Sequence, residues 1–306
     1  MLSNFRKYQC TIADTVSFSG IGLHSGMLCN VRLIPSAPDT GVVFIRKDLS
    51  FNNFIPADYR YIHKSKLCTT LKASNSDAKV ITVEHLLAAI KGNNIDNIKI
   101  EIDSQEIPIL DGSAKEFDDI IKNVGVVEQK KIFKKYLIVK KNISVQTKNS
   151  SFFIAPSNCF EIECTVEFPD PIGKQTVKLG KSFSNIYDRV KSAKTFCFYE
   201  DIETMKKNNL AKGGSLENAI VIKNGSILNS EFDDQTNYFA KHKTLDILGD
   251  LSLMNFNIIG KISVYYPGHE LNRLAMLEIF SSLSNYSIYQ YNKEKNFKSQ
   301  DNMLFA

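Results

Sequence analysis

The segment AKHKTLDILGDLSL, residues 240–253, places the tightest constraint on the fold. Read as a helix, it carries leucines and isoleucines on several faces, which predicts that the helix is buried. The same helix carries His242, Asp246 and Asp250, spaced four residues apart along one stripe. Burial of a carboxylate is unfavourable unless it is paired or binds a metal. The fold must therefore bring compensating partners to this helix.

Composition limits the classes of protein to which the chain can belong. Its 306 residues are 43% hydrophobic and 23% charged, which is typical of a globular protein large enough for two domains. The formal charge of +5 mildly favours anionic ligands, but the only dense basic run is KKIFKK at 130–135, so we expect no nucleic-acid partner. No apolar stretch is long enough for a transmembrane segment or a secretory signal, and we expect a cytoplasmic protein. The six cysteines form no C-x-x-C pair, which argues against a zinc ribbon and a disulfide framework.

The first part of the chain reads as strands, a helix, a strand and a second helix. The first helix is expected to begin near Thr82, which can cap it, and to end at Gly92. Ser113 and Glu116 form the S-x-x-E pattern of a capping box for the second helix. After the basic run EQKKIFKKY the pattern of strands and helices starts again.

The second part reads as strands, a helix near 184–192, a hairpin at Asn224-Gly225, the long helix, a strand and a last helix from about Asn272. We therefore predict an α+β fold of two domains, each a sheet packed with helices. The expected domains are residues 1–128 and 129–306. The sequence shows no heptad pattern and no large apolar stripe on its surface, and we expect a monomer.

Two helices carry the residues that suggest a metal site. Glu84 and His85 lie in the first turn of TVEHLLAAI, and adjacent helical residues point about 100° apart, so one can bind a metal while the other addresses something beside it. His242 and Asp246 have the i, i+4 spacing of a two-ligand clamp. Together they predict zinc held by His85, His242 and Asp246, with the fourth position left to water and Glu84 as the base.

Each of these residues also has a structural interpretation. A His-x-x-x-Asp pair on a helix is more often hydrogen-bonded than metal-bound, and spacing cannot show that the two helices meet. His269 follows a strand end at which Gly268 permits a tight turn, a common place for a catalytic side chain but also for an exposed histidine. Asp250 could orient and charge that histidine, or could pair with a surface lysine. The residues alone leave these alternatives open.

Eight segments narrow the choice when they are taken in order. They are SGIGLHSG, KLCTTL, TVEHLLAAIKGNNIDNIKIEI, EIPILDGSAKEF, AKTFCF, GGSLENAIVI, KHKTLDILGDL and GHELN. In this order, over nearly the whole chain, they resemble the zinc-dependent UDP-3-O-acyl-N-acetylglucosamine deacetylase family of lipid A (lipopolysaccharide) biosynthesis. The resemblance implies two domains of similar architecture with the active site between them. It also implies hydrolysis of an N-acetyl amide on a nucleotide-linked acyl sugar, with release of acetate.

The resemblance assigns roles to individual residues. His85, His242 and Asp246 match the zinc ligands, and Glu84 matches the general base. The other residues that it places in catalysis are His269 as the general acid or electrostatic partner, Asp250 as the partner of that histidine, and Thr195 as the hydroxyl that polarises the scissile carbonyl. Cys68 matches a cysteine close to the metal that is not an essential ligand.

Substrate contacts follow from the same resemblance. Lys243 matches a substrate-contacting lysine, and an insert near 197–222 matches the segment that builds a hydrophobic passage for the acyl chain. The residues expected to line the substrate site or this passage are Leu23, Phe196, Ile202, Leu216 and Val221.

The sequence departs from the family pattern at a few positions. Tyr266-Pro267 stands where the family more often has Lys-Ser, which puts a cationic contact to the nucleotide diphosphate in doubt. Cys197 stands where glycine is usual, and TNYFAKHK replaces a more acidic approach to His242. The sequence therefore leaves two alternative functions open besides deacetylation of this substrate. One is a module that binds RNA or a protein, and the other is the same hydrolytic chemistry on a different amide.

Overall fold

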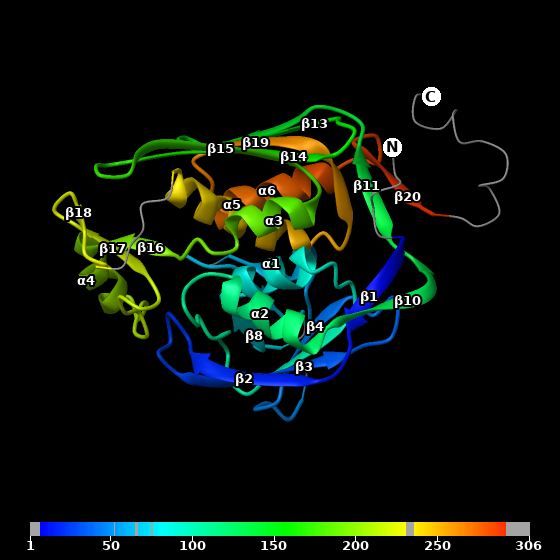
Figure 1. The fold of residues 1–306 in the computed structure, drawn as a ribbon, viewed down its shortest axis with the longest axis horizontal. Helices are drawn as coiled ribbons and strands as arrows, with labels where there is room; N and C mark the ends of the chain where they lie inside the picture. The colour runs from blue at the N-terminus through cyan, green and yellow to red at the C-terminus, as the bar shows by residue number, and fades with distance from the viewer. Residues whose placement is uncertain (1–6, 52, 65–66, 75, 231–235, 292–306) are drawn as a thin grey trace.

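The computed structural model has two main sheets with helices packed between them (Figure 1). It describes residues 7–51, 53–64, 67–74, 76–230 and 236–291. The helices in these ranges are α1 (Glu84–Gly92), α2 (Lys115–Val124), α3 (Phe183–Val190), α4 (Tyr199–Lys207), α5 (Tyr238–Ser252) and α6 (His269–Phe280), with a 3-10 turn at Tyr59–Tyr61. In Figure 1, α1 and α2 lie on the lower sheet and α5 and α6 on the upper one, and α1 packs on α5. None of these helices combines the length and apolar content that crossing a membrane requires.

The N-terminal half is built on a five-stranded sheet. Its strands are β2 (Val16–Ile21), β3 (Leu28–Pro35), β4 (Val42–Arg46), β5 (Phe54–Pro56) and β9 (Ile98–Ile102). The strand order is β2-β3-β9-β4-β5, with β4 and β9 parallel and the other pairs antiparallel. In β3, Cys29, Val31 and Leu33 are buried and alternate with more exposed residues. One face of the strand therefore joins the core, as an alternating pattern predicts.

The C-terminal half is built on a seven-stranded sheet. Its strands are β11 (Lys135–Val139), β12 (Ile143–Gln146), β13 (Ser151–Ala155), β14 (Phe160–Phe168), β15 (Gly173–Lys181), β19 (Asn257–Tyr265) and β20 (Tyr286–Gln290). The central strand β19 pairs parallel with β11 and β14 and antiparallel with β13. The strand β14 buries one face against α5. The prediction of an α+β fold with a sheet and helices in each half is confirmed.

Two smaller sheets complete the body of the molecule. One is a ribbon in which β1 (Tyr8–Ile12) pairs antiparallel with β10 (Val126–Phe133). The other contains β6 (Ile62–His63), β7 (Thr70–Lys72) and β8 (Lys79–Ile81). The expected domain boundary between residues 128 and 129 lies within β10, and the division into two domains at that point stays a prediction.

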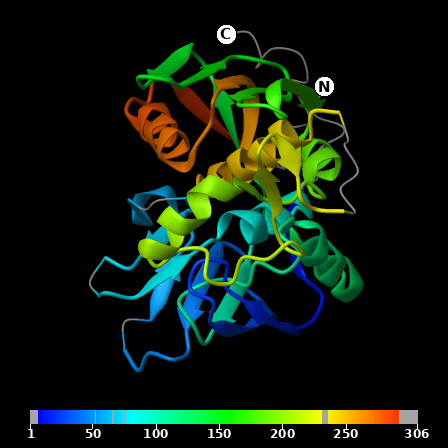
Figure 2. The same cartoon turned by 90° about the vertical axis from the view of Figure 1, so that its left-hand side faces the viewer.

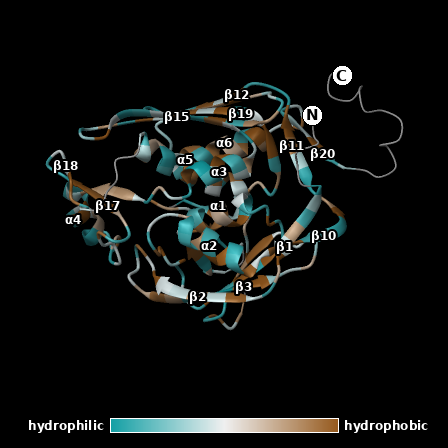
Figure 3. Ribbon diagram, viewed as in Figure 1, coloured by the Kyte–Doolittle hydropathy of each residue, from teal (hydrophilic) through white to brown (hydrophobic). Residues whose placement is uncertain are grey.

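A small lobe, residues 196–227, projects from the side of the molecule. It contains β16 (Phe196–Phe198), α4, β17 (Ile220–Lys223) and β18 (Ser226–Ile227). Figure 2 shows α4 in front of the level at which the two halves meet, and in Figure 3 β17 is coloured as hydrophobic. Asn224 and Gly225 have positive φ angles of 49° and 73° and join β17 to β18. The hairpin that the Asn-Gly dipeptide predicts is therefore confirmed.

The sequence was less informative about how the helices begin. The N-cap of α1 is Val83, and the hydroxyl of Thr82 donates a hydrogen bond to Glu106 instead. The N-cap of α2 is Ala114, and the hydroxyl of Ser113 accepts from the backbone of Lys115. The predictions of a Thr82 cap and a Ser113–Glu116 capping box were therefore wrong, because other polar groups take these hydroxyls: Glu106 from a distant segment in the first case, and the neighbouring Asp111 and Lys115 in the second.

Two other helix ends illustrate the same limit. As expected, α1 ends at Gly92, but the absence of a side chain there has a packing reason. A Cβ at Gly92 would lie 2.2 Å from the ring of Tyr187 on α3. The last helix begins at His269, three residues before the expected Asn272, so His269 lies in a first helical turn rather than in a loop.

Candidate active site and metal centre

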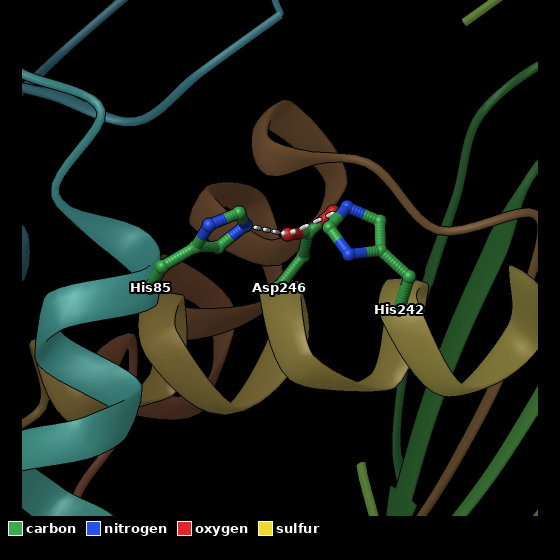
Figure 4. A group of neighbouring side chains, drawn as sticks. All are labelled: His85, His242 and Asp246. Atoms are coloured by element: carbon green, nitrogen blue, oxygen red, sulfur yellow. Dashed lines mark ion pairs between the residues drawn. The ribbon is translucent and has the colours of Figure 1, made fainter. Parts of the chain in front are cut away.

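Three buried side chains from two helices converge where α1 meets α5. His85 comes from α1, whereas His242 and Asp246 come from α5, and Figure 4 shows the two imidazoles on either side of the carboxylate. The Nε2 atoms of His85 and His242 lie 3.4 and 3.6 Å from Oδ1 of Asp246. One donor atom from each residue lies within 4.8 Å of the other two. The structure therefore brings the three expected metal ligands together.

The convergence depends on a close approach between the two helix backbones. A Cβ at Gly249 on α5 would lie 2.1 Å from the carbonyl oxygen of Glu84 at the start of α1. Any side chain at this position would push the helices apart. Since Gly249 stands between Asp246 and Asp250, this contact holds Glu84 and His85 beside both carboxylates of α5.

The spacing of the donor atoms fits a divalent cation. Two ligands about 2.1 Å from a tetrahedral ion lie roughly 3.4 Å apart, close to the two nitrogen–oxygen distances observed here. Nδ1 of His242 lies 3.0 Å from the carbonyl oxygen of Ala193. A hydrogen bond from Nδ1–H to this oxygen leaves the Nε2 lone pair free to face Asp246. Burial lowers the pKa of His242 to about 4, so the ring is neutral, as a metal ligand must be.

Asp246 has a second partner beside the two histidines. Its Oδ2 atom accepts a hydrogen bond of 2.6 Å from Nζ of Lys243, one turn earlier on α5. Although burial opposes ionisation, Lys243 and His242 hold the pKa of Asp246 well below its usual value. The carboxylate is thus ionised, with Oδ1 directed to the histidines and Oδ2 to the lysine.

A second carboxylate–histidine pair lies one turn further along α5. Nδ1 of His269 lies 2.9 Å from Oδ2 of Asp250, which also accepts a hydrogen bond from the amide of Asn272. Burial lowers the pKa of His269, but the carboxylates of Asp250 and Glu84 outweigh it and raise this pKa to about 9. His269 is therefore protonated at neutral pH.

Glu84 connects the two pairs. It is 4% exposed, its Oε1 lies 3.6 Å from Nε2 of His269, and its Oε2 accepts a hydrogen bond of 3.1 Å from the backbone of Thr69. Burial raises the pKa of its carboxyl, although the charge of His269 acts in the opposite direction. A carboxyl group with a raised pKa, a protonated histidine and a candidate metal site thus lie side by side, an arrangement suited to hydrolysis at a carbonyl.

Comparisons with known proteins agree with this arrangement. The family model described as UDP-3-O-acyl N-acetylglycosamine deacetylase matches residues 9–281. The chain is 38% identical to the UDP-3-O-acyl-N-acetylglucosamine deacetylase of Syntrophus aciditrophicus and 39% identical to that of Myxococcus xanthus, in each case over 92% of this chain and 88% of the relative. It is 35% identical to the Campylobacter hominis protein of the same name, over 94% of this chain and 96% of the relative. The chain belongs to this deacetylase family.

Two further residues that the family resemblance assigns lie beside α5. The backbone N–H of Thr195 donates to the carbonyl of Gly112, and Thr195 follows closely after Ala193, the partner of His242. The ring of Phe196 packs against His242 with their centroids 5.8 Å apart. The structure thus brings the segment 193–196 to the metal-site end of α5, and the roles of Thr195 and Phe196 stay predictions.

The expected passage residues lie in and beside the lobe. Leu23 is tied to it by the N–H of Gly213, which donates to the Leu23 carbonyl at 3.0 Å. Val221 is buried on β17, Ile202 is half-buried on α4, and Leu216 is 47% exposed. A passage bounded by these residues stays a prediction.

Two cysteines and Tyr266 can also be placed. Cys68 is 4% exposed, and burial followed by the charge of Glu84 raises its pKa to about 12, so its thiol is protonated and a poor metal ligand. Burial raises the pKa of Cys197 to about 11. Tyr266 has a positive φ of 52°, and its ring packs 5.1 Å from that of Phe168. Tyr266 therefore lies in an aromatic cluster.

Some contributors to the site were not identified from the sequence. The hydroxyl of Thr69 donates to Oδ1 of Asp250 at 2.5 Å and lies 3.1 Å from Nδ1 of His269. His24 is buried close enough to His269 for their charges to interact, its Nδ1 accepts from the N–H of Ala211, and its Nε2 has no hydrogen-bond partner among the described residues. The only sequence signal for Thr69 and His24 was their position inside two of the family segments.

Proposed function

We propose that this chain is a zinc-dependent amide hydrolase that removes the N-acetyl group of UDP-3-O-acyl-N-acetylglucosamine and releases acetate, in lipid A biosynthesis. The observation that carries the proposal is the convergence of His85 with His242 and Asp246 beside Glu84 and His269. Family membership supplies the substrate class. Two imidazole nitrogens and one carboxylate oxygen are a donor set typical of catalytic zinc, with one position left for the reaction.

Each residue of the site would contribute one part of the hydrolysis. When bound, zinc supplies Lewis-acid chemistry that lowers the pKa of a water from about 16 towards roughly 7 and polarises a carbonyl. Glu84 accepts the proton of the attacking water, and its raised pKa makes it a stronger base. Protonated His269 and the hydroxyl of Thr195 stabilise the negative charge that develops on the carbonyl oxygen.

The departing amine requires a proton, and two groups can deliver it. His269 is protonated at neutral pH, and Glu84 carries the proton taken from water. Their facing atoms are 3.6 Å apart, so both can serve the same leaving group. Asp250 keeps His269 charged and oriented through the Nδ1 contact.

The proposal also covers the remaining substrate contacts, the cellular compartment and the oligomeric state. Lys243 would contact the substrate, and the lobe would hold its acyl chain. We also propose a cytoplasmic monomer. All six cysteines lie in the described ranges as free thiols, which fits a reducing compartment.

One purified sample tests the proposal. We expect stoichiometric zinc by mass spectrometry, and deacetylation of UDP-3-O-acyl-N-acetylglucosamine that a chelator abolishes and added zinc restores. Full activity in a metal-free preparation would contradict it. Equal turnover of simple N-acetyl sugars would favour hydrolysis of a different amide, which the aromatic cluster at Tyr266 makes worth testing. Salt-dependent RNA binding without metal would favour the binding module.

A further inference from the structure

A second polar site lies at the other end of the contact between α1 and α5. There a cavity of about 140 Å³ is bounded by both halves of the molecule. Lys91 on α1 and Asp96 in the following loop contribute from the N-terminal half, and Lys135, Ser252 and Asn255 contribute from the C-terminal half. Lys91 follows His85 by six residues, which is roughly 9 Å along a helix. The cavity is therefore separate from the candidate metal centre but is built on the same two helices.

Lys91 is the unusual member of this cavity. It is 8% exposed, and its ammonium group makes no hydrogen bond or ion pair with any residue that the structure describes. Burying an unpaired charge is unfavourable. Burial accordingly lowers the pKa of Lys91 to about 8. The carboxylate of Asp96 acts in the opposite direction but offsets this lowering only in part. A buried ammonium group with no carboxylate in direct contact thus lines an open space.

The other charges around the cavity already have partners. Nζ of Lys134 donates to Oδ2 of Asp96. Oδ1 of Asp39 accepts from the amide of Gln9 at 2.8 Å and lies 3.6 Å from Nζ of Lys135. Together with Lys91, these are three lysines against two aspartates. One positive charge is left uncompensated, and it belongs to Lys91.

We propose that this cavity binds one small oxyanion, a carboxylate or phosphate group, through the ammonium of Lys91. The volume is close to the about 150 Å³ of a cavity that admits benzene, so acetate, formate or inorganic phosphate fits and a nucleotide does not. The bound anion would supply the missing charge and a charge-assisted hydrogen bond. This proposal does not depend on the proposed function.

An occupant would brace the contact between the two halves. Next to the cavity, the hydroxyl of Ser252 on α5 reaches the carbonyl of Leu87 on α1 at 3.5 Å. The anion would add a second link between the two halves by reaching Lys91 from one half and Lys135, which also lines the cavity, from the other. Because ligand binding to the folded state raises its stability, the anion should raise the melting temperature.

The test compares the full-length protein with K91M and with a control, K261M, which removes a lysine that is exposed on β19. Melting temperatures are recorded in rising sodium acetate or sodium phosphate at constant ionic strength set with sodium chloride. We expect a saturable rise of a few degrees in the wild type and K261M and no rise in K91M. The rise should persist after chelation, which separates this site from anion binding to a metal. The more effective of the two anions identifies the preferred group.

A direct observation completes the test. Crystals soaked in sodium arsenate, an oxyanion with the shape and charge of phosphate, should show one anomalous peak in contact with Nζ of Lys91, absent in K91M. A cavity that holds only water in these soaks, or an equal thermal response in K91M, would overturn the proposal. If K91M fails to fold, the wild-type soak decides on its own.

Discussion

Asp246 and Asp250 lie one turn apart on α5, and the pKa values of the histidines beside them shift in opposite directions. We call the surroundings of these two carboxylates the Asp246 pocket and the Asp250 pocket. In the pocket of Asp246, the pKa of His242 falls to about 4, whereas in the pocket of Asp250 the pKa of His269 rises to about 9. Both histidines are largely buried. Asp246 already shares its charge with Lys243, whereas the described donors to Asp250 besides His269 are neutral groups, from Thr69 and Asn272.

The difference shows that burial alone does not decide the charge of a buried histidine. Where the carboxylate already has a cation, the imidazole stays neutral and can bind a metal. Where it has none, the imidazole becomes that cation. The two carboxylates of α5 thereby place a candidate metal ligand, His242, and a fixed positive charge, His269 of α6, side by side. The following predictions test that contrast.

The largest effect is expected from breaking the Asp246 pocket. H242A removes one of the three donor atoms, so the protein should lose its bound metal, and turnover should fall to background. Metal content by mass spectrometry and a deacetylation assay check this. D250N is the matched control, because it alters the neighbouring pocket and should keep the metal. Tight metal binding by H242A would contradict the ligand assignment.

A smaller loss is expected when the group between the pockets is changed. E84Q keeps the shape of the side chain but cannot accept a proton, so turnover should fall about 10²–10⁴-fold. Metal content should be unchanged, because Glu84 is not among the three donors. Loss of metal in E84Q would show that Glu84 is a ligand and not a base.

The Asp250 pocket should respond through its pH dependence. In D250N, His269 loses the carboxylate that holds its pKa near 9, so the alkaline limb of the rate profile should move about 1–2 units lower. Turnover at pH 6 should change less than turnover at pH 8. A titration of the His269 ring by NMR gives the same pKa independently of activity. An unmoved alkaline limb would assign that limb to another group.

In the metal-free protein, the two histidines should change the free energy of unfolding with pH in opposite directions. The pKa of His269 is raised above its unfolded value of about 6.5, so its stabilisation is present below pH 6.5 and is lost as pH rises through about 9. The pKa of His242 is lowered, so stability is lost as pH falls from 6.5 towards about 4. Urea unfolding of H269Q and H242Q against the wild type measures both. The difference from the wild type should shrink on the alkaline side for H269Q and on the acid side for H242Q.

The smallest effect is expected at Thr69, which positions the Asp250 pocket. T69V keeps the volume but removes the hydroxyl that donates to Asp250, and turnover should fall about tenfold. T69S retains the hydroxyl and should recover most of the activity. If T69S were as slow as T69V, the methyl group rather than the hydrogen bond would matter.

Much of the site was accessible from the sequence because its signals are local. The spacing of His242, Asp246 and Asp250 on one apolar helix indicated partners, and Glu84-His85 indicated a pair that points two ways. Residue spacing could not show that His85 lies beside Asp246, since this contact depends on the packing of α1 against α5 at Gly249. The family segments supplied that step.

The residues that were missed share a physical reason. Thr69 lies between short strands and acts through contacts with residues about 180 and 200 positions away. The Thr82 cap failed in the same way, because Glu106 from another segment takes its hydroxyl. Local patterns predict local hydrogen bonds well, but they cannot show that a residue distant in the sequence competes for the same donor or acceptor.

The contact at Gly249 has one more implication. It is main chain against main chain, with no side chain in between. Rotamer changes and swaps of neighbouring apolar residues therefore cannot widen the gap between Glu84 and His85 on α1 and the candidate ligands on α5. Reactive geometry that rests on two backbones in direct contact is insulated from most of the side-chain motion and sequence drift around it.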